Sequence, residues 1–279
     1  MQIIENKSFD MERALYESDG IKLINCTFEG EADGESALKE SKNIEAYNST
    51  FKLRYPFWHD ENLFIKTTEL TDKCRAAIWY SKNINIENCR LNGIKVFREC
   101  HNTNINRTTI DSKECFWLCN DINIHSCKIT TEYPFFQCKD ITIENLELHG
   151  KYSFQYCSNV TIENSYLDTK DAFWGSKNVT VKNSTIKGEY LAWYAEDLTL
   201  INCEIIGTQP LCYCKKLILI DCKMVNCDLS FEYSDVDAKV IGQIDSVKNP
   251  YSGIIEADEI KEVILDENFV DKGIKIITK

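Results

Sequence analysis

A phrase of eight residues recurs along the chain every 19 residues, and no other feature limits the possible folds as strongly. The phrase INIENCRL begins at Ile84, and seven steps of 19 residues lead from there to LILIDCKM at Leu217. Looser copies begin at Ile21, Ile44 and Leu63. A unit of this length cannot bury its own apolar side chains, so successive units must stack on one another.

Within each copy the apolar residues alternate as they do in a β-strand. With Ile84 counted as position 1, they fall at positions 1, 3 and 8, with Asn common at position 5 and Cys, Ser or Thr at position 6. Period two and the abundance of Ile, Val and Thr favour a strand over a helix. An apolar residue, most often Phe, at position 14 and a small residue at position 17 predict a second short strand. Glycine at position 10 marks the turn between the strands in four copies: Gly93, Gly150, Gly188 and Gly207.

These patterns predict an all-β protein, folded as a single-stranded right-handed parallel β-helix with ~19 residues per coil and about 12 coils. Left-handed hexapeptide helices need a six-residue subperiod, and leucine-rich repeats need room for a helix that a Phe-containing strand occupies here. We expect residues 1–20 to form an N-terminal cap with a short helix over Phe9–Tyr16. Residues 21–235 should form the repeated coils and residues 236–279 the last coils and a C-terminal cap, all within one domain.

The charge of the chain restricts its partners. Lys and Arg total 32 against 44 Asp and Glu, so the formal net charge is −12 and nucleic acid is not an expected partner. The N-terminus lacks the basic and then apolar pattern of a signal peptide, and no apolar run approaches the ~20 residues that span a bilayer. We therefore expect a cytoplasmic protein with no membrane partner.

Ten of the 14 cysteines fall at two positions of the repeat that should face inward. They are Cys26, Cys89, Cys127, Cys203 and Cys222 at position 6, and Cys100, Cys119, Cys138, Cys157 and Cys214 at position 17. Ser, Thr or Ala replaces them in most other copies, so small size explains them and we expect free thiols in a packing ladder. No paired Cys or His motif accompanies them, so no metal and no cofactor is expected. The Asn residues at position 5 should form an amide ladder at a bend.

Aromatic side chains gather at position 15, one residue after the inward Phe. All five tryptophans occur there, and the column reads Lys39, Trp58, Trp79, Arg98, Trp117, Phe136, Gln155, Trp174, Trp193, Cys212 and Phe231. Tyrosines are frequent on the same side, at position 12 (Tyr133, Tyr152 and Tyr190) and at position 16 (Tyr194 and Tyr213). Alternation from position 14 predicts that the position-15 side chains point outward in one column.

An exposed aromatic stripe of this kind is typical of a binding site or an interface. One interpretation is a carbohydrate-binding or carbohydrate-processing protein, whose rings stack on the sugars of an extended glycan. The alternative is a non-enzymatic scaffold in which a partner, a second copy of the chain or the chain's own loops cover the stripe. A third interpretation is that position 15 turns partly inward and the rings belong to the core.

The same face offers weak candidates for catalysis, which would make the protein a polysaccharide hydrolase or lyase. Glycoside hydrolysis needs two carboxylates, and Asp171 and Glu189 on neighbouring coils are the nearest pair, with Glu132 two coils before Asp171. A lyase would need a base such as Lys170 or Arg98 beside a carboxylate. Acidic pairs arise often by chance on a surface with 44 acidic residues, so this constellation is a hypothesis only.

Several longer phrases resemble an uncharacterised bacterial domain-of-unknown-function family that is assigned to the pectin-lyase-like right-handed β-helices. They include ADGESALKESKN, LRYPFWHD, CRAAIWYSKN, TKDAFW, KGEYLAWYAEDLT, IGTQPLCYCK and DSVKNPYSG. The resemblance covers nearly the whole chain and implies the fold. It implies no catalytic residue, because the family has no assigned activity. The Asp clusters and Arg bases of pectin-lyase-like enzymes with known chemistry are not found here.

Overall fold

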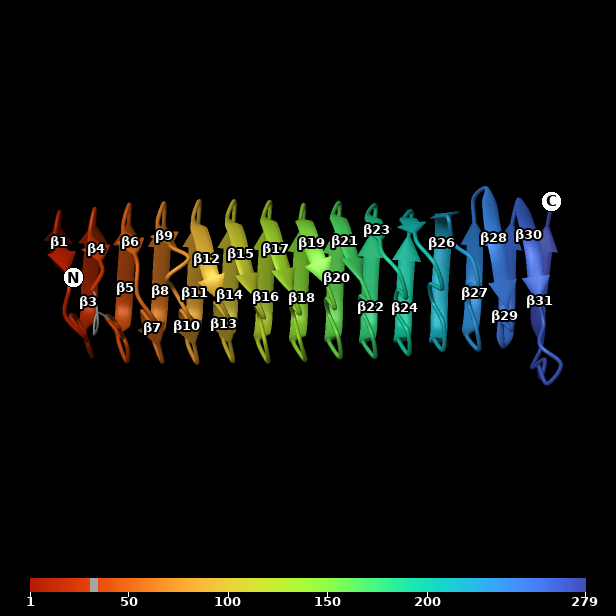
Figure 1. The fold of residues 1–279 in the computed structure, drawn as a ribbon, viewed down its shortest axis with the longest axis horizontal. Helices are drawn as coiled ribbons and strands as arrows, with labels where there is room; N and C mark the ends of the chain where they lie inside the picture. Colours follow the sequence, from red (N-terminus) through yellow and green to blue (C-terminus); the bar gives the residue numbers. More distant parts are fainter. Residues whose placement is uncertain (31–34) are drawn as a thin grey trace. The chain divides into compact units, whose positions relative to one another are not determined.

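The computed structural model describes residues 1–30 and 35–279, and within these ranges the chain forms 31 β-strands and no helix. The strands are parallel and stacked as a right-handed β-solenoid with coils of about 19 residues, which confirms the all-β fold that the repeat predicts (Figure 1). Residues 31–34, which belong to the expected run of coils 21–235, lie outside the described residues.

The octapeptide phrase forms the longest strand of each coil. In these strands positions 1 and 3 are buried: Ile84 and Ile86 pair with Leu63 and Ile65 on one side and with Thr103 and Ile105 on the other. The strands of this first sheet are β1 (Gln2–Glu5), β3 (Asp19–Ile24), β5 (Lys42–Tyr47), β8 (Glu61–Lys66), β11 (Lys82–Glu87), β14 (His101–Asn106), β16 (Asn120–His125), β18 (Lys139–Glu144), β20 (Ser158–Glu163), β22 (Lys177–Lys182), β24 (Glu196–Ile201), β26 (Lys215–Val225), β27 (Asp235–Val240), β29 (Ser252–Ala257) and β31 (Ile274–Thr278).

A second row of strands follows the bend at position 5 and buries the side chain at position 8. These strands are β2 (Ser8–Phe9), β4 (Thr27–Phe28), β6 (Thr50–Phe51), β9 (Glu69–Leu70), β12 (Arg90–Ile94), β15 (Thr109–Lys113), β17 (Lys128–Glu132), β19 (Glu147–Lys151), β21 (Tyr166–Lys170), β23 (Thr185–Lys187), β25 (Glu204–Ile206), β28 (Gln243–Lys248) and β30 (Glu259–Ile264). The third side of the coil carries positions 12 to 17 and includes three short paired strands, β7 (Phe57–Trp58), β10 (Ile78–Trp79) and β13 (Phe97–Arg98).

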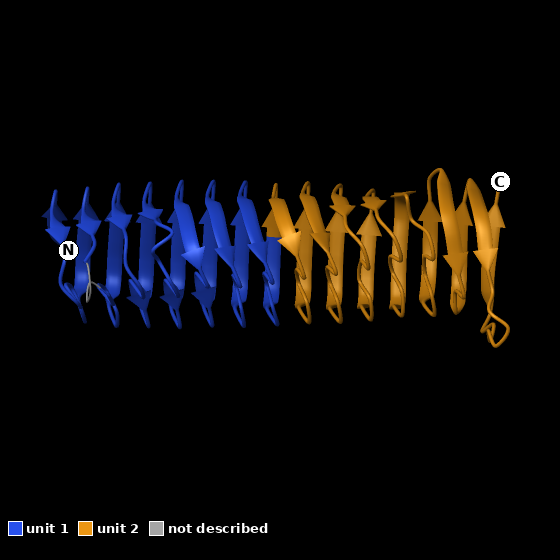
Figure 2. Ribbon diagram, in the orientation of Figure 1, with its two compact units in different colours: residues 1–142 blue, residues 143–279 orange. Residues whose placement is uncertain are grey.

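The chain divides into two units, and each unit is a stack of such coils. Unit 1 comprises Met1–Thr142 and unit 2 comprises Ile143–Lys279, so the junction falls inside β18 (Figure 2). Each unit is described separately below.

The solenoid has about 14 coils, against the expected 12, because coils form at both ends where the phrase is lost. At the N-terminus Gln2 of β1 pairs with Ile21 of β3, and at the C-terminus Gly253 of β29 pairs with Ile274 of β31. The expected helix over Phe9–Tyr16 is wrong. Phe9 ends β2 and residues 12–17 form turns, whose backbone bonds to the next coil, as Leu15 N–H does to the carbonyl of Ala37 at 2.8 Å.

The bend at position 5 explains why asparagine is common there. Asn25 and Asn183 have φ values of 53° and 49°, a left-handed conformation that Asn tolerates better than most residues. Their amides also bond between coils, from Asn25 Nδ2 to Asn6 Oδ1 at 3.2 Å and from Asn202 Nδ2 to Asn183 Oδ1 at 2.9 Å. The amide ladder that the sequence predicts at this bend is present at these two steps.

The core is a set of columns that run through each stack. Phe116 is fully buried at position 14, with its ring 4.5 Å from Phe97 and 4.8 Å from Phe135 between centroids. All 14 cysteines are buried free thiols, and at position 17 the backbone N–H of Cys100 contacts the Cys119 sulfur at 3.4 Å. The inward position of the cysteine columns is as the sequence predicts.

Candidate functional site

The position-15 residues of unit 1 form one column, as the repeat predicts. Trp58 pairs in register with Trp79, Trp79 with Arg98, and Arg98 with Trp117. The Trp58 and Trp79 rings are stacked at 5.4 Å with an interplanar angle of 5°. A cation covers each outer face of this pair, since the Lys39 ammonium lies 5.6 Å from the Trp58 ring and the Arg98 guanidinium 5.2 Å from the Trp79 ring. No open ring face remains in the Trp58–Trp79 pair.

The tryptophans are half-buried rather than fully outward, because most of their indole N–H groups bond to the backbone of the next coil. Trp79 Nε1 donates to the carbonyl of Lys95 at 2.6 Å, and Trp193 Nε1 donates to that of Gln209 at 2.8 Å. Trp58 and Trp117 make the same bond, to the carbonyls of Ala76 and Tyr133. The acceptor lies near position 12 each time, so the ring is held against the side of the solenoid.

The remaining unit 1 candidates lie close to Trp117. Its ring is 5.3 Å from that of Phe136, at a tilt of 46°. Tyr133, whose carbonyl accepts the Trp117 indole N–H, is 40% exposed.

Unit 2 arranges the same kinds of residue differently. Trp174 and Trp193 lie 5.4 Å apart at an angle of 32°, and Trp193 meets Tyr190 and Tyr213, both at 5.4 Å, at angles of 74° and 70°. Tyr194 contacts Trp174 at 5.4 Å and is 51% exposed. We call these five residues the unit 2 aromatic cluster. The rings around Trp193 are tilted, and within the cluster Tyr194 and Tyr213 stack face to face.

Trp174 differs from the other four tryptophans in its indole N–H. Within the described chain this group has no protein acceptor, whereas Trp58, Trp79, Trp117 and Trp193 each donate to a backbone carbonyl. The next residue is Gly175 (φ 62°), and a Cβ there would lie 2.8 Å from the ring of Tyr156. The Tyr156 ring therefore packs against Gly175, and the coil of Trp174 has no side chain at position 16. The indole N–H of Trp174 is therefore a hydrogen-bond donor within the unit 2 aromatic cluster that the described part of the protein does not use.

Two further tyrosine sites of unit 2 carry charged neighbours. Tyr194 and Tyr213 are stacked at 4.9 Å with a 12° angle, and Tyr213 Oη donates to Glu232 Oε2 at 3.4 Å. Burial, followed by the charge of Glu232, raises the pKa of Tyr213 above its ordinary value. Tyr152 is half-buried, with the Lys151 and Lys170 ammonium groups 5.7 Å and 5.8 Å from its ring centroid.

The structure brings three of the candidate catalytic residues together in unit 2. The backbone N–H of Asp171 donates to the carbonyl of Glu189 at 2.8 Å, and Lys170 Nζ lies 3.8 Å from Asp171 Oδ2. Burial raises the pKa of Asp171, Lys170 opposes this rise and the charge of Glu189 adds to it. Lys170, Asp171 and Glu189 thus lie on two neighbouring coils, the arrangement that the repeat predicts.

The other two candidates do not join this group. Arg98 belongs to unit 1, where its guanidinium lies over Trp79 and its Nε bonds to Glu99 Oε1 at 3.3 Å. Glu132 also belongs to unit 1 and is half-buried, and its carbonyl accepts the N–H of Glu114 at 2.8 Å.

Two members of the expected outward column are buried, and both expectations are wrong. Cys212 has an exposure of 0%, with its thiol directed at backbone carbonyls that include Pro210 at 3.6 Å. Phe231 is also fully buried, and its N–H bonds to the carbonyl of Pro210 as an inward position-14 residue does. An extra residue in the preceding bend moves Phe231 one place back in the coil, and a fixed count of 19 misses this shift.

Sequence reasoning overlooked one buried acid. Asp60 stands at position 17 of unit 1, where other coils have Ser or Cys, and it is 1% exposed. A charged residue in a column of small ones was the signal that could have revealed it. Among the described residues, no group of three or more His, Cys, Asp or Glu side chains is arranged to hold a metal ion. No helix in the described ranges is long and apolar enough to cross a membrane.

Comparison with known proteins identifies a family but no activity. The sequence model of the family described as "Protein of unknown function (DUF3737)" matches residues 2–278. No curated protein matches the chain.

Three solved structures are similar to the chain. A structure of QnrB1, a plasmid-mediated fluoroquinolone resistance protein, is 12% identical with a TM-score of 0.24, over 80% of this chain and 92% of that one. Tailspike protein 3 of bacteriophage CBA120 is 10% identical with a TM-score of 0.26, over 99% and 51%. PfbA, a surface adhesin of Streptococcus pneumoniae, is 10% identical with a TM-score of 0.26, over 99% and 70%. These identities and TM-scores are low, so the functions of these proteins do not carry over to the chain.

Proposed function

The chain belongs to the DUF3737 family, whose function is unknown, and we propose from its own surface that it binds glycans through the unit 2 aromatic cluster. The observation that carries the proposal is the arrangement of Trp174, Tyr190, Trp193, Tyr194 and Tyr213. Their rings meet Trp193 at angles of 32° to 78°, and the indole N–H of Trp174 has no acceptor in the described chain. Ligand sites combine apolar and aromatic walls with a few placed polar groups, and this cluster has both.

The polar groups next to the cluster suit a polyhydroxyl ligand. Lys170 and Asp171 lie on the coil of Trp174, and Glu189 precedes Tyr190 on the next coil. Carboxylates accept hydrogen bonds from hydroxyl groups, while the Lys170 ammonium and the Trp174 N–H donate them. Asp171 and Glu189 on neighbouring coils also supply the two carboxyl groups that glycoside hydrolysis needs, so a polysaccharide hydrolase or lyase activity is an extension of this proposal.

The proposal is tested by titrating the full chain with a panel of neutral and acidic oligosaccharides. Binding is followed by tryptophan fluorescence and calorimetry. We expect at least one glycan to bind, and Trp193→Ala to weaken its binding about tenfold or more. The matched control is Trp79→Ala, because Trp79 has the same repeat position, the same half-burial and the same indole bond to a backbone carbonyl. Trp174→Phe removes the unused N–H and part of the ring, and should weaken binding several-fold, as expected for the loss of one hydrogen bond and some ring contact.

The same experiment decides between glycan binding and the scaffold alternative. The stacked Tyr194, Tyr213 and Tyr233, with centroids 4.9 Å and 6.0 Å apart, present ring edges and hydroxyl groups, as tyrosines do in protein interfaces. If no glycan of the panel binds, the glycan-binding proposal is wrong. If sedimentation then shows an oligomer that Tyr194→Ala dissociates, the cluster serves as an assembly surface.

A further inference from the structure

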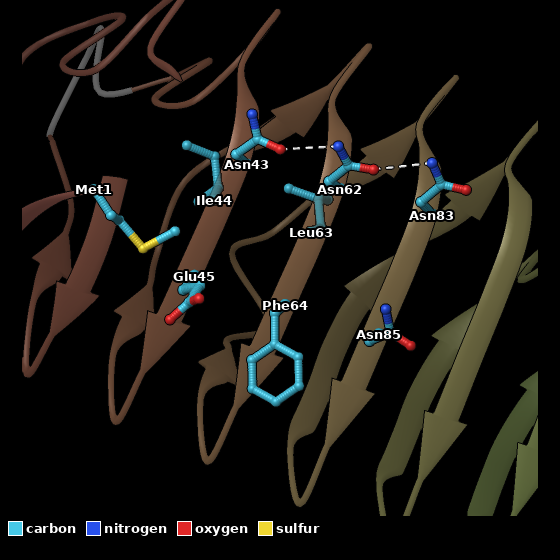
Figure 3. A pocket seen from close by; sticks show the side chains of 9 residues that line it. All are labelled: Met1, Asn43, Ile44, Glu45, Asn62, Leu63, Phe64, Asn83 and Asn85. Carbon is cyan, nitrogen blue, oxygen red and sulfur yellow. Dashed lines mark hydrogen bonds between the residues drawn. The ribbon is translucent and has the colours of Figure 1, made fainter. Parts of the chain in front are cut away.

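A shallow groove lies on the outer face of the first sheet in unit 1, away from the position-15 column. It has a volume of about 250 Å³ and crosses β5, β8 and β11 (Figure 3). The outward side chains of positions 19 and 2 line it, in particular Asn43, Asn62, Asn83, Phe64 and Asn85.

One wall of the groove is a row of side-chain amides. Asn62 Nδ2 donates to Asn43 Oδ1 and Asn83 Nδ2 donates to Asn62 Oδ1, both at 2.9 Å (Figure 3). Asn43 Nδ2 in turn donates to Asp19 Oδ1 at 2.7 Å. An amide has two N–H donors and two acceptor lone pairs, so each internal member of the row keeps one donor and one lone pair for a ligand. The chain of bonds also fixes which end of each amide is the donor.

Phe64 supplies the one aromatic ring of the groove, whose other apolar lining residues are Met1, Ile44 and Leu63. Its ring is half-buried and stands apart from the amides, and Asn85 lies on the next strand (Figure 3). In the neighbouring coils position 2 holds Glu45 and Asn85, so Phe64 is a single aromatic side chain in a polar row.

The groove has few charged groups. Its lining includes no Lys or Arg, and its one carboxylate, Glu45, is paired with Lys22 at 3.3 Å and accepts the Tyr47 hydroxyl at 3.1 Å. Glu45 is therefore compensated by Lys22, and apart from Met1, which carries the N-terminal ammonium, the other lining residues are uncharged.

We propose that this groove is a binding site for one ring of an uncharged sugar, held by the Asn43–Asn62–Asn83 amide row and by the Phe64 ring. Paired donors and acceptors along the row match neighbouring hydroxyl groups of a sugar, and the aromatic ring takes its apolar C–H face. A volume of 250 Å³ is below the roughly 300–1,000 Å³ of sites for drug-sized ligands, so it suits a single ring. The site lies entirely in unit 1 and does not depend on the unit 2 aromatic cluster.

The site is tested by saturation-transfer NMR and calorimetry on the full chain. The sugars are glucose, galactose, mannose, N-acetylglucosamine and glucuronate. We expect at least one of the neutral sugars to bind more tightly than glucuronate, and Phe64→Ala to weaken that binding about tenfold. Ile218→Ala is the matched control, because Ile218 also stands exposed at position 2 but lies in unit 2. Asn62→Ala should also weaken binding, whereas Asn178→Ala, which breaks the same kind of amide bond at 2.8 Å in unit 2, should not.

The result separates this proposal from the unit 2 site. The groove is supported if Phe64→Ala reduces sugar binding and Trp193→Ala does not. This holds whether or not the unit 2 aromatic cluster binds glycans. The proposal is overturned if no neutral sugar binds in a manner that depends on Phe64, or if glucuronate occupies the groove more tightly than every neutral sugar.

Discussion

The Asp60 carboxyl accepts a hydrogen bond at its Oδ1 from the backbone N–H of Ser41, at 2.9 Å, inside the core of unit 1. Its other oxygen, Oδ2, is buried with no partner. Burial raises the pKa of Asp60 to about 9, the hydrogen bond from Ser41 opposes this rise and the charge of Glu40 adds to it. Asp60 is therefore protonated in the folded protein at neutral pH.

Protonation of Asp60 makes stability depend on pH in an unusual direction for an acid. Between its unfolded pKa near 4 and its folded pKa of about 9, the folded state holds a proton that the unfolded state has released. The contribution of this proton to the free energy of unfolding is then fully present below pH ~4. It falls as the pH rises, by up to about 1.4 kcal/mol per pH unit. Asp60→Ser, the residue of neighbouring coils, should therefore stabilise the protein by a few kcal/mol at pH 8 and much less at pH 5.

Urea unfolding of both proteins from pH 5 to pH 8.5 measures this difference. Asp60→Asn serves as control, because it keeps an acceptor for the Ser41 N–H without a titrating group. If the free energy of unfolding changes with pH in the same way for the wild type and both variants, then Asp60 does not have a raised pKa.

Gly188 allows two neighbouring coils to approach closely at position 10. Its φ is 148°, and a Cβ there would lie 2.6 Å from the carbonyl carbon of Thr169. Since backbone cannot move aside as a flexible side chain does, Gly188→Ala should cost about 2–4 kcal/mol. Gly242→Ala is the control, because its φ of 87° is also strained but nothing lies within 4 Å of the new Cβ. Equal losses for the two variants in thermal unfolding would assign the cost to φ alone.

The fold was predictable because one period decides which side chains share a column. The alternation around Ile84 and Ile86 determines the inward face, and a 19-residue step leaves no other partner than the next coil. The same period correctly placed Trp58, Trp79 and Trp117 in one column. Errors arose where the count changes, as at Phe231, or where the phrase is absent, as in the extra coil of β1.

The candidate site was less predictable, because a repeat position does not determine how a ring is tilted. Trp79 and Trp193 share position 15, yet Trp79 is stacked on Trp58 at 5° and Trp193 meets its neighbours at 32° to 78°. These angles depend on side-chain rotation and on the neighbours, which are Arg98 in one case and Tyr190 in the other. The groove beside Phe64 depends on a single aromatic residue that departs from the repeat, and the periodic pattern does not show it.

Most of the buried cysteines should be almost unreactive in the folded protein; the exception to their raised pKa values is Cys203, whose pKa is lowered by a hydrogen bond with Cys222. Burial raises the pKa of Cys74 to about 11 and that of Cys214 to about 12, and only a thiolate attacks a disulfide reagent. With Ellman's reagent at pH 8 we expect very slow labelling of the native protein, and 14 reactive thiols once guanidinium unfolds it. Rapid labelling of several thiols before unfolding would contradict this burial.

The indole N–H of Trp79 should contribute more to stability than that of Trp174. Trp79→Phe leaves the Lys95 carbonyl without its 2.6 Å donor, and a lost hydrogen bond to a partly buried group costs about 1–2 kcal/mol. Trp174→Phe removes an N–H that has no protein acceptor in the described chain, so beyond the smaller ring it should cost less. Urea unfolding of the two variants gives the difference directly, with Trp193→Phe expected to behave as Trp79→Phe because of its bond to Gln209. If Trp174→Phe proves as destabilising as the other two, then ring packing, and not the indole bond to the next coil, holds these tryptophans in place.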